Sequence, residues 1–395
     1  MLWGLVGGGR GSQIGEAHRI GARLDGLFTL TAGALDADAA RGREFAIELG
    51  VDEVRSYSDW REMRDAESKR PPEERLNLIT VATPNSTHYE ITRGFLEVGF
   101  NVLCEKPLTM TIEEAESLCA VAAEAGVICA VNFGFSGYPM AIQAREMIRR
   151  GDLGDIRVVM AEFAHGAHAD GNDQDNPRVR WRYDPAEAGV SSAVADLGIH
   201  ALHMAQFMIG QRITSISAHF DRCVPGRQLE DDALLAYRFD KAAVGRLWTS
   251  AIACGQPQGF SMRVFGSKGG LRWHQEFPDQ LYWSPLGKAT RILERGDSQL
   301  YPEAAAASRI TIGHVEGLFG AFGNIYRSLY AAIGAKPISE SLRPNFPTVQ
   351  DGADMVRAVH ASAASAALDG AWVDLSTLER SARSGREVNA QGPPP

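Results

Sequence analysis

The first 135 residues of this 395-residue chain contain short, wholly apolar runs that alternate with helical patterns. Runs of this length without polar alternation are typical of buried strands. Buried strands that alternate with helices form a parallel sheet with helices on both faces. The five runs that we expect to be strands are Leu2–Val6, Phe28–Leu35, Leu76–Ala82, Asn101–Cys104 and Val127–Phe133.

The pattern changes later in the chain, where strand-like stretches follow one another with few helices between them. They are Ile213–Phe220, Ala233–Phe239, Val244–Ile252 and Phe260–Phe265. Consecutive strands without crossover helices favour a mostly antiparallel sheet. We therefore predict an α/β protein with a doubly wound parallel sheet in residues 1–135, a second α/β domain in residues 136–380, and a disordered tail over residues 381–395.

A glycine-rich loop follows the first predicted strand and precedes a helical pattern. Gly7, Gly9 and Gly15 supply the three glycines of a dinucleotide-binding turn, with three more residues between the last two than is usual. The helix after the loop offers free N–H groups to a pyrophosphate. Asp36, at the end of the second strand, favours NAD over NADP, because a carboxylate there binds ribose hydroxyls and repels a 2′-phosphate. The alternative is a purely geometric turn beside a solvated acid.

Composition excludes several classes of partner. A net charge of -9 argues against nucleic-acid or anionic-membrane binding, which needs a basic face. Five scattered cysteines without a C-x-x-C pair argue against disulfides and zinc clusters and favour a reducing compartment. No apolar run is long enough to span a bilayer, and no room for a signal peptide precedes Gly7. We therefore expect a cytoplasmic protein without a membrane partner.

Two motifs make the sequence recognisable, "TPNSTH" at 83–88 and "CEKPLTMTIEEAESL" at 104–118, and "DLGIH" at 196–200 follows them. With these the chain resembles the Gfo/Idh/MocA oxidoreductases, named for glucose-fructose oxidoreductase and inositol dehydrogenase, from residue 2 to about residue 375. The resemblance implies an N-terminal Rossmann domain and a C-terminal α/β domain whose large open sheet makes the contact of a homodimer or homotetramer. It also implies NAD(P)-linked oxidation of a sugar or polyol.

The resemblance assigns catalytic roles to Lys106, Asp196 and His200. Imidazole titrates near neutrality, so His200 suits the base that takes the hydroxyl proton. On a helix, Asp196 would share a face with His200 and orient its ring. Lys106 can stabilise developing alkoxide charge, and Pro107 restricts the backbone beside it and permits a cis bond. The alternative is a surface ion pair of Glu105 with Lys106 and a packed histidine.

The resemblance also implies the binding residues. Those expected to hold the cofactor are Gly7, Gly9, Gly15, Asp36, Thr83, Pro84, Asn85, His88, Glu105 and Lys106. Those expected to face the substrate are His165, Trp181, Arg182 and His314. An aromatic ring can stack on a sugar face and arginines can clamp an anion, although a basic stretch facing solvent explains the same residues. His203 replaces an acid found in many relatives, which puts one substrate contact in doubt. We expect no metal, because the H-x-x-H pairs lack a third ligand.

Three functions fit these residues. The first is an NAD-dependent dehydrogenase of a secondary hydroxyl in a sugar, sugar derivative or inositol-like cyclic polyol. The second is an NAD-dependent glycoside hydrolase that transiently oxidises C3 and eliminates the leaving group, including from carboxylated or sulfonated glycosides. The third is a non-catalytic NAD-binding sensor. A dehydrogenase accumulates NADH, the hydrolase releases sugar at constant NAD, and the sensor binds without turnover.

Overall fold

The computed structural model describes residues 1–176, 179–335 and 345–378, so the predicted tail at 381–395 lies outside the described residues. The chain divides into two compact units. The first comprises Met1–Met110, Glu114–Ile142 and Arg295–Ala353, and the second comprises Thr111–Glu113, Gln143–Glu294 and the chain from Asp354 onward. A segment near the C-terminal end therefore belongs to the N-terminal unit, which the sequential division at residue 135 does not anticipate.

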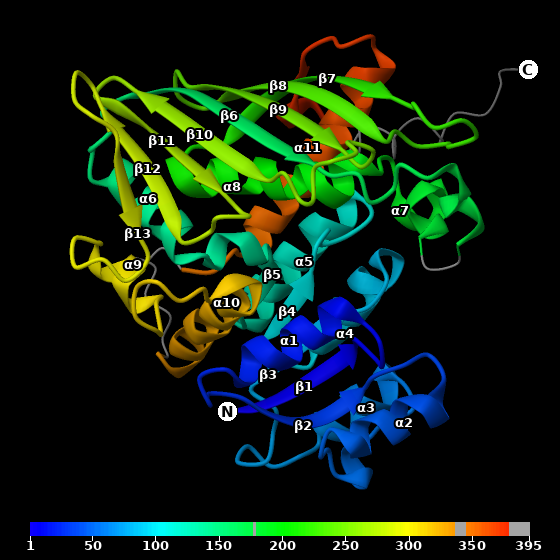
Figure 1. Ribbon diagram of the computed structural model, residues 1–395. Coiled ribbons are helices and arrows are strands. Elements are labelled where there is room, and N and C mark those ends of the chain that lie inside the picture. The colour runs from blue at the N-terminus through cyan, green and yellow to red at the C-terminus, as the bar shows by residue number, and fades with distance from the viewer. Residues whose placement is uncertain (177–178, 336–344, 379–395) are drawn as a thin grey trace, which may run out of the picture. The chain divides into compact units, whose positions relative to one another are not determined.

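The first unit is built on a five-stranded parallel sheet with the order β2-β1-β3-β4-β5 (Figure 1). Its strands are β1 (Leu2–Gly7), β2 (Thr29–Ala34), β3 (Leu78–Ala82), β4 (Val102–Glu105) and β5 (Cys129–Asn132). Each of the five predicted runs contains most of one strand. In this order the chain reverses direction of winding between β1 and β3, and such a switch point is where open α/β sheets bind ligands.

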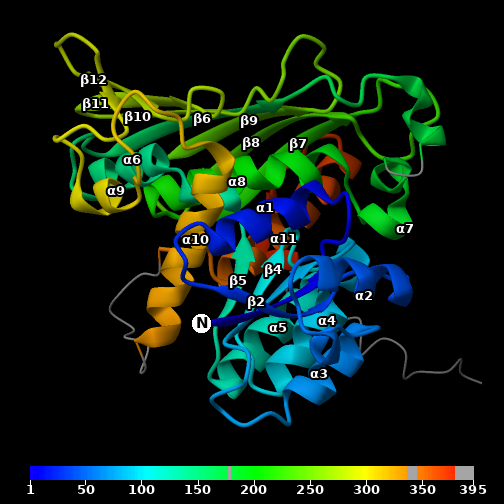
Figure 2. The same ribbon diagram turned by 60° about the horizontal axis from the view of Figure 1, so that its bottom comes forward.

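Helices cover both faces of this sheet. Figure 2 shows α1 and α10 side by side over one face, and α3 and α4 on the other. The helices of the unit are α1 (Gln13–Arg23), α2 (Ala39–Glu48), α3 (Trp60–Glu67), α4 (His88–Glu97), α5 (Ile112–Ala125), α9 (Pro302–Ala306) and α10 (Gly317–Gly334). Two further helices, α6 (Pro139–Arg149) and α11 (Val349–Ala367), run from one unit into the other.

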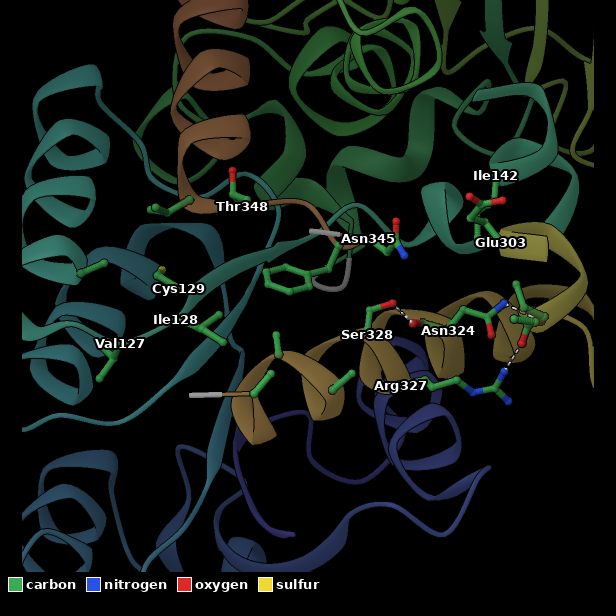
Figure 3. A pocket seen from close by; sticks show the side chains of 18 of the residues that line it. Val127, Ile128, Cys129, Ile142, Glu303, Asn324, Arg327, Ser328, Asn345 and Thr348 are labelled. Carbon is green, nitrogen blue, oxygen red and sulfur yellow. Dashed lines mark hydrogen bonds between the residues drawn. The ribbon is translucent and has the colours of Figure 1, made fainter. Parts of the chain in front are cut away.

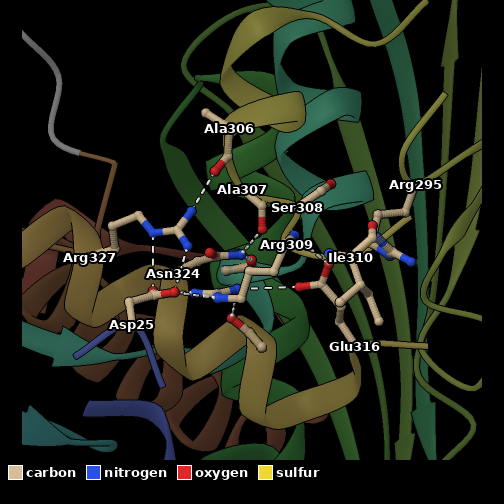
Figure 4. A network of polar contacts seen from close by, with 12 residues as sticks. Asp25, Arg295, Ala306, Ala307, Ser308, Arg309, Ile310, Glu316, Asn324 and Arg327 are labelled. Atoms are coloured by element: carbon tan, nitrogen blue, oxygen red, sulfur yellow. Dashed lines mark hydrogen bonds and ion pairs between the residues drawn. The ribbon is translucent and has the colours of Figure 1, made fainter. Parts of the chain in front are cut away.

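Close packing and ion pairs explain why the segment from Arg295 to Ala353 joins the first unit. Gly21 of α1 lies so close to α10 that a Cβ there would be 2.8 Å from Cβ of Phe322. Asp25, just after α1, accepts paired hydrogen bonds from both Arg309 and Arg327 (Figure 4). These guanidinium groups hold the pKa of Asp25 at about 2 against the opposing effect of burial. Both the close packing and the ion pairs join residues that are far apart in the sequence, so a local sequence pattern reveals neither of them.

The second unit contains a nine-stranded sheet with the order β13-β12-β11-β10-β6-β9-β8-β7-β14. All neighbouring pairs are antiparallel except β6 with β9. Its strands are β6 (Ile156–Ala164), β7 (Ile213–Asp221), β8 (Asp232–Phe239), β9 (Val244–Ser250), β10 (Ser261–Gly266), β11 (Gly269–His274), β12 (Gln280–Pro285), β13 (Arg291–Glu294) and β14 (Val373–Asp374). The prediction of a mostly antiparallel second sheet is confirmed.

One face of the second sheet is covered and the other is open. Along β8 buried and more exposed residues alternate, which is the pattern of a strand with one covered face. Helix α8 (Ile199–Ile209) contacts β6 and β9 on the covered side, and the short α7 (Pro185–Ala188) precedes it in the chain (Figure 1). The opposite face exposes apolar side chains, among them Leu234 and Phe265.

Candidate functional site

The glycine-rich loop lies at the carboxyl end of β1, beside the end of β3. The amide of Gly8 donates to the carbonyl of Ala82 over 2.9 Å. Helix α1 begins at Gln13, two residues before the third glycine, and Ser12 caps it by accepting a hydrogen bond from the amide of Gly15 over 3.0 Å. The three extra residues thus form the end of the loop and the cap of the helix.

Steric limits show that this loop is shaped for close approach. Gly7 and Gly8 have positive φ angles of 75° and 63°, which favour glycine. A Cβ at Gly15 would lie 2.2 Å from the carbonyl oxygen of Gly8, and one at Gly9 would lie 2.6 Å from that of Leu35. The backbone therefore leaves no space for side chains where a pyrophosphate approaches a helix N-terminus, and these residues fit NAD.

Asp36 stands just after β2, where a ribose-binding acid is expected. Its carboxylate accepts two hydrogen bonds from Arg41, at 2.8 Å from Nε and 2.6 Å from Nη2, and a third from the amide of Asp38 at 3.0 Å. The Arg41 guanidinium is the main cause that holds the pKa of Asp36 below its usual value. The acid is therefore ionised and partly engaged by a cation, which sequence analysis did not foresee.

His88 joins the loop after β3 to the turn after β4. Its side chain is completely buried, with Nδ1 2.7 Å from the carbonyl oxygen of Pro107 and Nε2 2.9 Å from that of Thr83. Both partners are acceptors, so both ring nitrogens must donate and the ring is an imidazolium. Burial by itself lowers the pKa of His88, but Cys104 and the two carbonyl groups raise it to about 9. His88 thus braces the two loops.

The other residues of the "TPN" loop stand at the same edge of the sheet. The loop follows β3 directly, and Thr83 accepts a hydrogen bond at its Oγ1 from Thr87 over 2.8 Å. Pro84 is exposed and Asn85 is half-buried. Since β1 and β3 are neighbours, this loop adjoins the glycine-rich loop at the switch point.

Lys106 follows β4 in a turn that Glu105 anchors from within. The Lys106–Pro107 bond is cis, as the sequence allowed. Glu105 is buried; its Oε1 accepts from His18 over 2.9 Å and from Nδ2 of Asn132 over 2.5 Å, and its Oε2 accepts from the Lys106 amide over 3.1 Å. Glu105 is therefore no exposed surface acid.

Asp196 and His200 lie in the second unit, at the start of α8. Asp196 belongs to a π-helical turn, Val194–Gly198, that continues directly into α8, so Asp196 and His200 lie on one continuous helical segment. Such turns often occur at functional sites. Three hydrogen bonds to Oε1 of the buried Glu230 fix the beginning of this segment. Lys106 belongs to the first unit, so its convergence with these residues stays a prediction.

Three of the predicted substrate residues gather around the same helical segment. Arg182 donates from Nε to Oδ2 of Asp196 over 3.1 Å, and its guanidinium carbon is 4.5 Å from the ring centre of Trp181. His165 is buried, and burial, followed by the charge of His168, lowers its pKa. His165 and His200 both contact the ring of Phe163, with ring centres 6.4 Å and 6.1 Å away.

His314, the fourth predicted substrate residue, is exposed and belongs to the first unit. The buried Arg295 fixes its loop by donating to the carbonyls of His314 and Ile310 and to the carboxylate of Glu316. Arg309 also contacts Glu316. His203, at the position where the resemblance led us to expect an acid, is buried and stacks on Phe207.

A large cavity of about 700 Å³ in the first unit is not the candidate site. It is lined by Val127, Ile128 and Cys129 at the amino end of β5 and by α10 (Figure 3). Ligands of parallel sheets bind at the carboxyl ends of the strands, where the glycine loop and Lys106 lie. Among the described residues, no three His, Cys, Asp or Glu side chains form a group that would hold a metal.

The parallel sheet, its glycine loop at the switch point and the acid after β2 define a dinucleotide-binding protein with a second unit that carries further polar groups. Residues 1–133 match the family described as an NAD-binding Rossmann-fold oxidoreductase family, and residues 141–272 match the GFO/IDH/MocA C-terminal domain. The chain therefore belongs to the Gfo/Idh/MocA family of NAD-binding oxidoreductases.

Similar proteins span nearly the whole chain. An uncharacterised oxidoreductase of Bacillus subtilis, YfiI, is 38% identical over 95% of this chain and 97% of its own length. An inositol dehydrogenase homologue from Azotobacter vinelandii, solved with NADH and myo-inositol, is 39% identical with a TM-score of 0.88 over 95% of this chain and 97% of that chain. Levoglucosan dehydrogenase of Pseudarthrobacter phenanthrenivorans is 26% identical over 70% of this chain and 74% of its own length.

Sequence reasoning overlooked some residues that the structure brings to the site. His18 and Asn132 bind Glu105, and Arg41 binds Asp36. The only local signal for His18 is its place three residues after Gly15 in the first helix.

No helix among the described residues is long and apolar enough to cross a membrane.

Proposed function

We propose that this protein is an NAD-dependent dehydrogenase that oxidises a secondary hydroxyl group of an inositol-like cyclic polyol or a sugar. The observation that carries the proposal is the Lys106 turn, which the buried Glu105 anchors at the carboxyl edge of the NAD-binding sheet. Support for the substrate class comes from the solved homologue with myo-inositol and from levoglucosan dehydrogenase.

Each catalytic residue has one role in this proposal. His200 accepts the proton of the substrate hydroxyl group. Asp196 orients the imidazole ring, and Lys106 donates a hydrogen bond to the reacting oxygen as negative charge develops on it. Bound NAD supplies the two-electron acceptor, and Gly7, Gly9, Gly15, Asp36 and the loop Thr83–Asn85 hold it.

The electrostatics of the second unit favour a neutral substrate. Arg182 forms an ion pair with Asp196 of the proposed catalytic pair. A cation that is compensated by a carboxylate has little charge left for a sulfonate or carboxylate of the substrate. Trp181 and His165 supply an apolar ring face and a polar nitrogen, which suit the ring and hydroxyl groups of a polyol.

The experiment compares Lys106→Ala with the wild type on NAD and a panel of inositols and anhydrosugars, with NADH formation followed by absorbance. We expect kcat to fall by at least about 100-fold, the effect of losing one group that stabilises an oxyanion, while the protein still binds NADH with measurable affinity. The control is Lys69→Ala, which removes an exposed lysine of the same unit and should change neither value. Unchanged turnover in the Lys106→Ala protein would refute the assignment.

The same panel separates the rival functions. Accumulation of NADH with a free polyol supports the dehydrogenase. Release of sugar from a glycoside at constant NAD supports the hydrolase, and tight binding of a sugar without either change supports the sensor. We propose further that the protein forms a cytoplasmic homodimer or homotetramer through the open face of the second sheet, which light scattering would measure.

A further inference from the structure

A chain of buried polar side chains crosses the first unit and ends beside Lys106. Nε1 of Trp3 donates to Oγ1 of Thr80 over 2.9 Å, and that oxygen is 2.9 Å from the hydroxyl of Tyr326. The Tyr326 hydroxyl is 2.8 Å from Nδ1 of His18, and Nε2 of His18 is 2.9 Å from Oε1 of Glu105. All these side chains are buried, and they come from β1, β3, α10, α1 and β4.

One direction of the hydrogen bonds in this chain gives every polar hydrogen an acceptor. The indole N–H of Trp3 can only donate, and the ionised carboxylate of Glu105 can only accept. In that arrangement the hydroxyl group of Thr80 accepts from Trp3 and donates to Tyr326. Tyr326 in turn donates to Nδ1 of His18, which carries its proton on Nε2 and donates it to Glu105. Every proton has one acceptor in this arrangement.

The last member of the chain binds the main chain of the Lys106 turn. Oε2 of Glu105 accepts from the Lys106 amide, and Oε1 also accepts from Asn132 on the neighbouring strand β5. Burial by itself raises the pKa of Glu105, but the hydrogen bonds of His18 and Asn132 and the charge of Lys106 hold that pKa below its ordinary value. The carboxylate thus stays ionised and fixed from two sides.

We propose that His18 is a positioning residue for Lys106. It fixes Glu105, and Glu105 fixes the main chain of the turn from which the Lys106 side chain extends. This inference rests on the proposed function in one respect, the catalytic role of Lys106. Stability alone does not require such a chain, because apolar side chains of similar volume often replace buried polar networks without loss.

The test compares two replacements of His18, one that keeps its hydrogen bonds and one that removes them. In His18→Gln the amide can donate to Glu105 and accept from Tyr326, as the imidazole does. In His18→Leu a side chain of similar bulk does neither. The control is Tyr326→Phe, which removes a more distant hydroxyl group of the chain and leaves the bond between His18 and Glu105 in place.

We expect kcat with NAD and myo-inositol to fall by about 10- to 100-fold in His18→Leu, because misplacing a catalytic group by about 1 Å has effects of this size. His18→Gln and Tyr326→Phe should stay within about threefold of the wild type, which is a fraction of the 1.4 kcal/mol per tenfold change. NADH affinity, measured by fluorescence, should be alike in all four proteins. Hydrogen exchange of the apoprotein should be faster at the Lys106 amide in His18→Leu only.

The pH profile provides a readout that a loss of packing would not change. The charged and titratable groups that face Glu105 are His18 of α1, Lys106 beside it and Tyr326 of α10. Without His18 the effect of burial on Glu105 is less opposed, so the acid limb of kcat should move to higher pH in His18→Leu. In His18→Gln it should move less, because the hydrogen bond remains.

Several outcomes would overturn the inference. Wild-type kcat in His18→Leu would do so, as would equal losses in His18→Gln and His18→Leu, or a loss confined to NADH affinity. If His18→Leu does not fold, His18→Asn takes its place, because its shorter amide cannot reach both partners. Wild-type turnover in Lys106→Ala would instead refute the proposed function, and hydrogen exchange would still decide whether His18 holds the turn.

Discussion

The buried imidazolium of His88 makes a prediction about stability and pH. The ring donates to the carbonyls of Thr83 and Pro107, and a neutral ring would turn a lone pair towards one of these oxygens. In His88→Gln the amide nitrogen can donate to one of the two carbonyl oxygens, but the amide oxygen then faces the other, which is also an acceptor. We therefore expect His88→Gln to destabilise the protein at pH values where His88 of the wild type is protonated.

The size and sign of the effect follow from the pKa of His88. A rise of the His88 pKa from the ordinary 6.5 to about 9 corresponds to at most about 3.5 kcal/mol, at about 1.4 kcal/mol per pH unit. Part of the rise comes from Cys104 and not from the two carbonyl groups that the glutamine would face, so we expect about 1–2 kcal/mol. Because the folded pKa lies above the unfolded one, this stabilisation is complete below pH 6.5 and is lost as the pH rises through 9.

The assay is urea unfolding of the wild type and His88→Gln at closely spaced pH values from acid to alkaline. The difference in free energy of unfolding should be largest at the acid end and should shrink at the alkaline end. The matched control is His219→Gln, which replaces an exposed histidine and should follow the wild type at every pH. If the free energies of unfolding of the wild type and His88→Gln differed by the same amount at every pH, His88 would not stabilise the protein as a charged imidazolium.

Three further predictions concern the cofactor loop and the helix of the proposed base. Arg41→Ala removes the cation that can pair with a 2′-phosphate, so the ratio of NADP to NAD dissociation constants, measured by fluorescence titration, should rise about tenfold; an unchanged ratio contradicts this. Gly15→Ala should weaken NADH binding by about 100-fold or more because its Cβ meets the backbone, whereas Gly334→Ala, which meets nothing closer than 3.9 Å, should bind normally. Glu230→Ala leaves buried amides without an acceptor and should cost about 1–3 kcal/mol in urea unfolding, and Glu230→Gln, which keeps an acceptor oxygen, should cost less.

The parallel sheet was predictable because its signals are local. A strand buried on both faces is apolar along its length, and glycine marks the turn after it, so runs such as Leu2–Val6 locate a strand without knowledge of its neighbours. Strands β11 to β13 gave weaker signals, because they are short and have half-exposed or exposed side chains, and β11 begins with two glycines. The number of strands in the second sheet could not be derived from such segments.

The candidate site was predictable to a similar degree. The sequence indicated Lys106 and Asp36 by residue type and position. The residues that bind Asp36 and anchor the Lys106 turn could not be predicted, because their local sequence patterns do not indicate a functional role. Arg41 has the pattern of a solvated helical residue, and only the close approach of α2 to the end of β2 makes it a ligand of Asp36. His18 faces Glu105 because α1 lies over the sheet beside β4, which is a property of the packed unit.

The same reasoning explains why one chain segment joins a unit far from it in sequence. Asp25, Arg309 and Arg327 each resemble a solvated charge when the sequence is read locally. In the structure the carboxylate of Asp25 binds both guanidinium groups in bidentate pairs, and these ion pairs lower the pKa of Asp25. These charges meet because α1 packs on α10, so a sequence can contain the residues of such a network without revealing which of them meet.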